Sequence, residues 1–377
     1  MRFLDRERAA LDTFLPKLDD MLASTPLVEL ERPGSPGIAA FRECGGPGLL
    51  VPTEYGGAGA SALDTVRVQR ALGARSPSLA VATTMHHFSM ASIVLLAQTG
   101  TGFEWMLMEG VARGNKLLAS GFAEGRPDAG ILAPSMTAQP ADGGILVSGV
   151  KRPCSLARSM DLLTASVLLP RRDGPGEQLA VVLIPAESPG LTVSTFWGSF
   201  ALAGAESDQV TIDEVFVPEE LVVRPDTTPG QQLDGVQSAG FLWFELLMSA
   251  SYLGAASALV ERVLPGERVP EVERVRLVVE LQGAMAAVEN IARQVPDAQR
   301  DPALLADALL VRYAVQDAIA RAVPRAVELL GGLAFISSDE IGYLAAAVHG
   351  LGFHPPARGK MAAPLARYLL GEPLEIA

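Results

Sequence analysis

Glu245 is the residue whose surroundings most strongly suggest chemistry. It is the only charged residue between Asp234 and Glu261, and apolar residues fill 241–244 before it and 246–248 after it. A carboxylate in such surroundings loses hydration, so its pKa should rise and it should be paired or functional. Two interpretations are open: a base that accepts a proton from a substrate, or a partner in an ion pair or hydrogen bond inside a helix bundle.

The other residue types that commonly do chemistry are sparse. The two cysteines, Cys44 and Cys154, lie far apart in the sequence, so neither a disulfide framework nor a CxxC metal site is available. The four histidines (His86, His87, His349, His354) lack the spacing of a zinc site. We therefore expect no metal site.

The segment that carries Glu245 is predicted to be a buried helix. Residues 236–260 are almost wholly apolar, and a helix that is apolar all round is buried on all sides. Further helical patterns follow at 271–295, 302–330, 338–350 and 359–370. Long helices with short connections are typical of an antiparallel bundle.

A different pattern occupies the middle of the chain. From Lys116 to Pro218 the period of two replaces helical periodicity in short aliphatic and β-branched segments at 145–148, 162–169, 179–185 and 209–217. Gly, Pro or Asp bounds each segment, as expected for strands. More than a hundred residues of helix-like sequence lie on either side. We predict an α+β fold with an all-α domain at 1–117, a β domain at 118–226 and a helical bundle at 227–377.

Composition excludes several classes of partner. The chain of 377 residues is 49% hydrophobic and has a formal net charge of −13, which argues against nucleic acid and anionic membranes as partners. Its apolar runs are interrupted by polar residues or are too short to predict a membrane span. The charged N-terminal residues do not match a secretory signal. We expect a cytoplasmic protein.

Five segments carry recognisable strings: GlyLeuLeuValProThrGluTyrGlyGlyAlaGly at 48–59, the stretch 114–124, ValSerGlyValLysArgProCysSer at 147–155, the stretch 196–218, and GluLeuLeuGlyGlyLeuAlaPhe at 328–335. In this order and along nearly the whole chain, they resemble motifs of the acyl-CoA dehydrogenase superfamily. The resemblance implies an N-terminal helical domain, a β-barrel-like middle domain and a C-terminal four-helix bundle.

The resemblance also implies that FAD is the cofactor. Residues corresponding to those beside the pyrimidine side of the flavin are Phe122, Ala123 and Glu124. Those corresponding to the N5 edge are Cys154 and Ser155. Those corresponding to residues that face the cofactor's diphosphate across a subunit interface are Gly331 and Gly332.

The sequence departs from the family at functional positions. Ala123 replaces a usual Thr and Pro153 replaces a usual aromatic residue, and the RxxFG motif is missing after the first bundle helix. The C-terminal Glu that removes the substrate's α-proton is also missing, because 345–359 contains no acid. Two candidates for the base then stand out: Glu245, on the helix where a subset of the family places it, and His354, in the loop that usually carries it.

The resemblance implies α,β-dehydrogenation of an acyl thioester carried by CoA or a carrier protein, with an electron-transfer partner. A first alternative is a reduced-flavin-dependent monooxygenase or oxidase, which needs no α-proton base. A second is a degenerate member that binds a ligand without redox chemistry. From their sequence, we expect helices at 236–260 and 302–330 to carry more apolar surface than one bundle hides, which predicts a homodimer or homotetramer.

Overall fold

The computed structural model describes residues 2–98, 104–126, 134–171, 176–224, 233 and 235–376. Its N-terminal part is a layer of helices, several of them begun by residues that suit a helix start. Ser61 and Ser76 cap α5 and α6 with their side chains, and Pro77 occupies the first turn of α6. The helices are α1 (Asp5–Phe14), α2 (Leu18–Ala23), α3 (Leu27–Leu30), α4 (Pro36–Glu43), α5 (Ala62–Arg75), α6 (Pro77–Ala97) and α7 (Glu104–Gly114).

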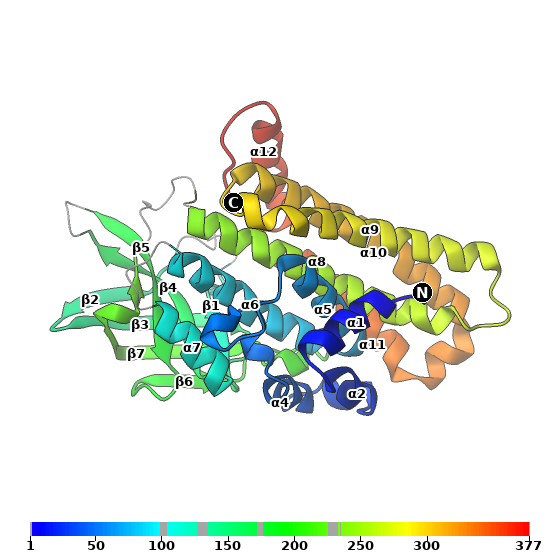
Figure 1. Cartoon of the computed structure of the whole chain (residues 1–377), viewed down its shortest axis with the longest axis horizontal. Coiled ribbons are helices and arrows are strands. Elements are labelled where there is room, and N and C mark those ends of the chain that lie inside the picture. Colours follow the sequence, from blue (N-terminus) through cyan, green and yellow to red (C-terminus); the bar gives the residue numbers. More distant parts are fainter. Residues whose placement is uncertain are drawn as a thin grey trace.

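The described middle residues form eight strands in one sheet, at one end of the molecule (Figure 1). The order across the sheet is β6-β7-β3-β2-β4-β5-β8, and β1 pairs in parallel with the first half of β4. The strands are β1 (Leu118–Gly121), β2 (Thr137–Ala141), β3 (Gly144–Cys154), β4 (Leu162–Pro170), β5 (Glu177–Pro185), β6 (Leu191–Ser194), β7 (Asp208–Pro218) and β8 (Val222–Val223).

Three long helices run from the sheet toward the far end of the molecule, and α9 packs against both α8 and α10 (Figure 1). Two shorter helices follow them. The helices are α8 (Gly235–Val263), α9 (Glu271–Ala298), α10 (Pro302–Ser337), α11 (Asp339–Ala347) and α12 (Arg358–Leu369). The fold predicted from the sequence, helices on both sides of a β region, is confirmed. The expected boundary between residues 226 and 227 lies outside the described residues.

Helix α8 is the centre of the core. It packs against α5 and α6 of the N-terminal layer and against α9, α10 and α11 of the C-terminal helices. Its close contact with α5 depends on two glycines, because a Cβ on Gly73 would collide with the carbonyl of Ser251 and one on Gly254 with the carbonyl of Arg70. Both α6 and α8 are long and apolar enough to cross a membrane, yet 78% and 100% of their most apolar windows are buried inside the protein.

The burial of α8 corrects part of the argument for an oligomer. Its apolar surface, which we expected to exceed what one bundle can hide, is covered within the chain. Exposed apolar side chains lie instead on α9, at Val272, Val275 and Val279, and on the last turns of α10, at Leu333 and Ile336.

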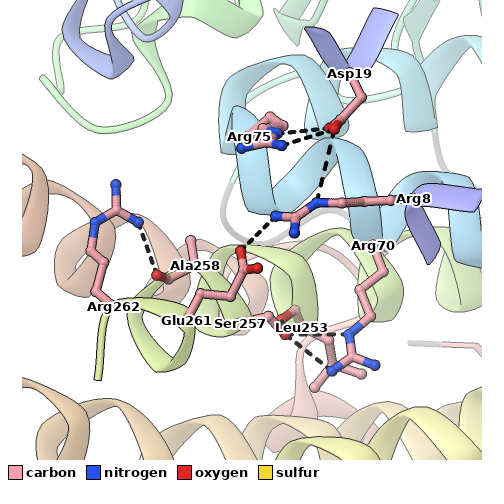
Figure 2. Close-up of polar contacts among 9 residues, drawn as sticks. All are labelled: Arg8, Asp19, Arg70, Arg75, Leu253, Ser257, Ala258, Glu261 and Arg262. Carbon is pink, nitrogen blue, oxygen red and sulfur yellow. Dashed lines mark hydrogen bonds and ion pairs between the residues drawn. The ribbon is translucent and has the colours of Figure 1, made fainter. Parts of the chain in front are cut away.

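An ion pair and buried hydrogen bonds connect the C-terminal half of α8 to the N-terminal helices (Figure 2). Arg8 pairs with Glu261 at 2.7 Å, and Asp19 receives both Arg8 and Arg75. Arg70 is fully buried and donates to the Ser257 hydroxyl. The side chains drawn in Figure 2 thus fix α8 against α1, α2 and α5 at the end of the helix away from the sheet.

Candidate active site

A cavity of about 260 Å³ lies where the sheet meets the helices. Strands β1, β4 and β5, helix α6, the first turns of α8 and the loop that carries His354 all contribute to its wall. Apolar side chains provide most of the surface, together with several hydroxyl groups. Such a concave, mainly apolar site with a few convergent polar groups is the usual form of a small-molecule site.

Three of the residues predicted to border a flavin line this cavity: Phe122, Ala123 and Ser155. The Ser155 hydroxyl is 2.9 Å from the Ser207 hydroxyl, and Trp197 completes that side of the wall. Flat apolar surfaces and nearby hydroxyl groups fit an isoalloxazine ring, whose rim needs hydrogen bonds while its faces need apolar contacts. These residues would therefore hold a flavin.

Two other predicted residues are turned away from the cavity. Cys154 is fully buried, and burial raises the pKa of its thiol to about 12. Glu124 accepts from the buried Lys151 ammonium at 2.7 Å and from Ser135. Burial raises the pKa of Glu124, but these bonds more than offset that effect and hold it below its usual value. Neither residue is part of the described cavity wall, and we interpret both as structural.

Gly331 and Gly332 also lie outside the described wall of the cavity. Gly331 has φ 84° and ψ 161°, which interrupts the helical conformation of α10. Gly331 lies 19 residues after Arg312, which corresponds to roughly 28 Å of helix at 1.5 Å per residue. Arg312 is the residue of α10 that binds the loop carrying His354. Within one chain the two glycines cannot contact a ligand in the cavity. Their contact with a cofactor in a second subunit stays a prediction.

Glu245 forms a buried ion pair. Its two carboxylate oxygens accept from Nη1 of Arg312 at 2.7 and 3.0 Å, and both side chains are fully buried. Burial raises the pKa of Glu245, and the charge of Arg312 opposes that rise. Of the two interpretations that the sequence left open, the geometry agrees with the ion pair. The carboxylate faces a guanidinium, and Glu245 is absent from the described cavity wall.

Arg312 also binds the loop after α11. It donates to the main-chain carbonyls of Leu351 at 3.0 Å, His354 at 2.6 Å and Pro355 at 3.3 Å. Tyr313, the next residue on α10, donates to the carbonyl of Pro356 at 3.2 Å. The end of this loop is therefore held at its main chain by α10.

His354 is the sequence candidate that the fold brings to the cavity. Its Nε2 lies 2.8 Å from the Tyr252 hydroxyl, and its ring meets Phe244 edge to face with centroids 6.1 Å apart. Burial first, and the nearby charge of Arg312 second, lower the pKa of His354 to about 3. The ring is thus neutral at physiological pH and available as a hydrogen-bonding group.

Comparison with known proteins gives the family of the chain. Residues 23–102 match the N-terminal domain of acyl-CoA dehydrogenases. Over the whole length of both proteins, the chain is 48% identical to isobutylamine N-hydroxylase from Streptomyces viridifaciens. The chain belongs to the acyl-CoA dehydrogenase superfamily. It is accordingly a member of a group of flavin-dependent oxidoreductases, and its fold has close structural counterparts within that group.

Two solved structures show how closely the superfamily fold is kept. FMN-bound TdsC from Paenibacillus sp. A11-2 has a TM-score of 0.84 at 21% identity and covers 98% of each chain. A nitrososynthase from Micromonospora carbonacea var. africana has a TM-score of 0.83 at 19% identity, again over 98% of each chain. At these identities the likeness establishes the fold.

Sequence reasoning missed Arg312 and Tyr252. Arg312 had a signal, since it stands alone between the apolar residues 309–311 and 313–315. This signal is weaker than that of Glu245, because Asp307 and Asp317 lie within five residues of Arg312 on the same helix, but buried charges of opposite sign are expected to pair. Tyr252 had a weaker signal, because it lies two helical turns after Glu245 among small residues that do not distinguish it from core.

Proposed function

We propose that this protein is a monooxygenase that uses reduced flavin and dioxygen to N-hydroxylate a small aliphatic primary amine. The observation that carries the proposal is the 48% identity, over the full length of both proteins, to isobutylamine N-hydroxylase. The size and apolar walls of the cavity suit a short branched alkyl group, and its hydroxyl groups suit an amine.

The reaction has a simple balance. Dioxygen, the amine and reduced flavin give the hydroxylamine, water and oxidised flavin. One oxygen–oxygen bond breaks and one nitrogen–oxygen bond forms; the second oxygen atom leaves as water. When bound, reduced flavin supplies the two electrons for this activation of dioxygen.

The chain's own residues would bind, orient and exclude water. Phe122, Ala123 and Ser155 would hold the flavin ring, and Phe244 would cover the reacting region. His354, uncharged and fixed by Tyr252, would offer a hydrogen bond to the oxygen or nitrogen atom that reacts. The apolar wall would keep bulk water from the activated oxygen.

We propose FMN as the flavin. FMN lacks the second phosphate and the adenosine of FAD, so it does not depend on the RxxFG motif that the chain lacks. A structural neighbour binds FMN in the same fold. The FAD predicted from the sequence is the alternative. Equilibrium dialysis against reduced and oxidised forms of both flavins separates the two.

Dehydrogenation of an acyl thioester has less support from the site. It requires a base for the α-proton, whereas Glu245 is engaged by Arg312 and the pKa of His354 lies at about 3. Hydroxylation reacts through the nitrogen lone pair of the deprotonated amine and breaks no carbon–hydrogen bond, so it needs no base able to remove an α-proton.

The test supplies reduced FMN, ¹⁸O-labelled dioxygen and isobutylamine to the purified protein and analyses the products by mass spectrometry. The expected product is N-isobutylhydroxylamine with one labelled oxygen. His354→Ala should lower the yield of hydroxylamine per flavin oxidised, whereas the control His349→Ala, at an exposed position five residues earlier, should not. No hydroxylamine, together with anaerobic bleaching of bound flavin by acyl thioesters, would favour dehydrogenation. Failure to bind either flavin would favour the degenerate member.

We also propose that the protein is a homodimer or homotetramer. Val272, Val275 and Val279 recur at helical spacing on α9 and are 61% to 70% exposed, and an exposed apolar stripe of this kind marks an interface. Light scattering at micromolar concentration should give a mass of at least two chains, and Val275→Glu should lower it. A monomer for the wild type would refute the assembly.

A further inference from the structure

The cavity wall includes seven hydroxyl side chains among the described residues: Ser89, Ser92, Ser120, Ser155, Thr164, Ser166 and Ser207. A hydroxyl group has one proton to donate and two lone pairs that accept. What each one can offer a bound molecule therefore depends on where its proton is already used. The hydrogen bonds within the protein answer that question for several of them.

Ser89 and Thr164 have both used their protons on main-chain carbonyls. Ser89 Oγ donates to the carbonyl of Met85 at 3.0 Å, one turn earlier on α6. Thr164 Oγ1 donates to the carbonyl of Ala119 at 3.0 Å, across the pairing of β4 with β1. What the two side chains can still offer to the cavity is lone pairs.

The two oxygens are also neighbours. Ser89 Oγ and Thr164 Oγ1 lie 3.4 Å apart, whereas hydroxyl–hydroxyl hydrogen bonds are usually about 2.7–2.8 Å long. The shorter bonds to carbonyl oxygens are the better ones, so the two hydroxyl oxygens face each other without a proton between them. Both residues are more than nine-tenths buried. Buried acceptors of this kind are normally matched by donors.

Ser166, on the same strand as Thr164, has the opposite character. The buried Lys151 ammonium donates to its Oγ at 3.1 Å, and an ammonium group can only donate. One lone pair of Ser166 is thus used while its proton is not committed to any hydrogen bond among the described residues. The wall therefore separates acceptors, at Ser89 and Thr164, from a donor at Ser166.

We propose that Ser89 and Thr164 form the subsite that binds the substrate's amino group, with their two oxygens accepting its two N–H bonds. Amine binding here presupposes the N-hydroxylation proposed above. A neutral primary amine has two N–H donors and one lone pair, so a pair of acceptors holds the donors and leaves the lone pair free to react with oxygen. A thioether with the same isobutyl group has no donor and would leave both oxygens unpaired.

The test measures binding of isobutylamine and of isobutyl methyl sulfide by calorimetry to protein loaded with oxidised flavin. Ser89→Ala and Thr164→Val should each weaken the amine about threefold to tenfold, the effect of losing one ordinary hydrogen bond. Binding of the sulfide should change less than twofold, or tighten. The double variant should lose most of the preference for amine over sulfide.

Thr65→Val is the matched control. Thr65 is fully buried on α5, donates from Oγ1 to the carbonyl of Ser61 at 2.7 Å, and stands apart from the described cavity wall. It should lose similar thermal stability without changing amine affinity. Unchanged amine affinity in folded Ser89→Ala and Thr164→Val would overturn the subsite, as would wild-type protein that prefers the sulfide. Tight amine binding without hydroxylamine formation would instead refute the proposed function and leave the subsite standing.

Discussion

Two arginines are fully buried against α8, and they do different things. Arg70 meets the second half of the helix and is bound by side chains from three helices: Glu7 on α1 at 2.8 Å, Ser257 on α8 and Gln282 on α9 at 2.6 Å. Arg312 meets the first half, about 18 Å away along the helix, and is bound by Glu245 and by three main-chain carbonyls of one loop.

The difference lies in what each guanidinium holds. Side-chain partners on rigid helices join those helices, so Arg70 fixes packing. Main-chain partners determine the position of the loop itself, so Arg312 fixes the residues that this loop presents, including His354 at the cavity. Arg70 thus contributes to stability alone, whereas Arg312 contributes both to stability and to the position of His354 at the cavity.

The largest expected effect comes from removing each guanidinium group, which tests this comparison directly. Arg312→Met and Arg70→Met should each lower the free energy of unfolding by about 3–5 kcal/mol, because a buried carboxylate loses its counter-ion. Urea unfolding measures this loss. In the fraction that stays folded, Arg312→Met should reduce hydroxylamine formation more than tenfold, whereas Arg70→Met should leave it within a few-fold of wild type. Equal losses of activity would mean that the two ends do not differ.

Acid tests two histidines, the fully buried His86 and the half-buried His354 at the cavity. His86 accepts from the Leu118 amide at Nδ1 and lies 2.9 Å from the Pro47 carbonyl at Nε2, and burial lowers its pKa to about 4. The folded state keeps the ring neutral while the unfolded chain binds a proton below about pH 6.5. Its contribution is therefore complete above pH 6.5 and is lost as the pH falls toward 4.

The free energy of unfolding should accordingly fall by about 3 kcal/mol from His86 alone between pH 6.5 and 4. Unfolding followed by circular dichroism over this range measures the slope. His86→Gln should flatten it. His354, whose pKa is also lowered by burial, should add to the slope, and His354→Asn would remove that part. A wild-type slope of zero would contradict both assignments.

Two glycines allow a steric test, one beside Arg70 and the other beside His354. A Cβ at Gly254 would collide with the main chain of α5, beside Arg70, while a Cβ at Gly350 would collide with the Tyr252 hydroxyl, beside His354. Gly254→Ala should cost about 1–3 kcal/mol of stability because two helices must separate. Gly350→Ala should cost less, since a side chain can move, yet it should disturb the Tyr252–His354 contact. Differential scanning calorimetry should show the larger loss of stability in Gly254→Ala, whereas the product yield should be lower in Gly350→Ala.

The smallest expected effect concerns Tyr252. Tyr252→Phe removes the hydroxyl that lies 2.8 Å from His354 Nε2 and should cost about 0.5–1.5 kcal/mol. In ¹⁵N-histidine spectra of flavin-free protein, the His354 signals should shift while those of His86 stay in place. Ser257→Ala, beside Arg70, should lower stability by a similar amount and leave the His354 signals unchanged. A shift of the His354 signals in Ser257→Ala would show that the surroundings of Arg70 and of His354 are coupled.

The sequence by itself determined the order of the elements. Period-two segments between helical stretches predicted the sheet, and the apolar stretch 236–260 predicted a helix buried on all sides, which α8 is. Motif order identified the superfamily, and the lone charge of Glu245 indicated a residue that had to be paired or functional, without deciding between the two. These features are local or depend on one segment's own periodicity, so they can be predicted without knowing which other elements the segment packs against.

Only the tertiary structure decided which candidates reach the cavity. Cys154 and Ser155 are adjacent in the sequence, but successive residues at the end of β3 face different ways, so one is sealed and the other lines the wall. The partner of Glu245 lies 67 residues away on α10. The donor or acceptor character of Ser89, Thr164 and Ser166 depends on bonds to other segments or to an earlier turn. Such properties belong to contacts between elements, and no single stretch of sequence contains them.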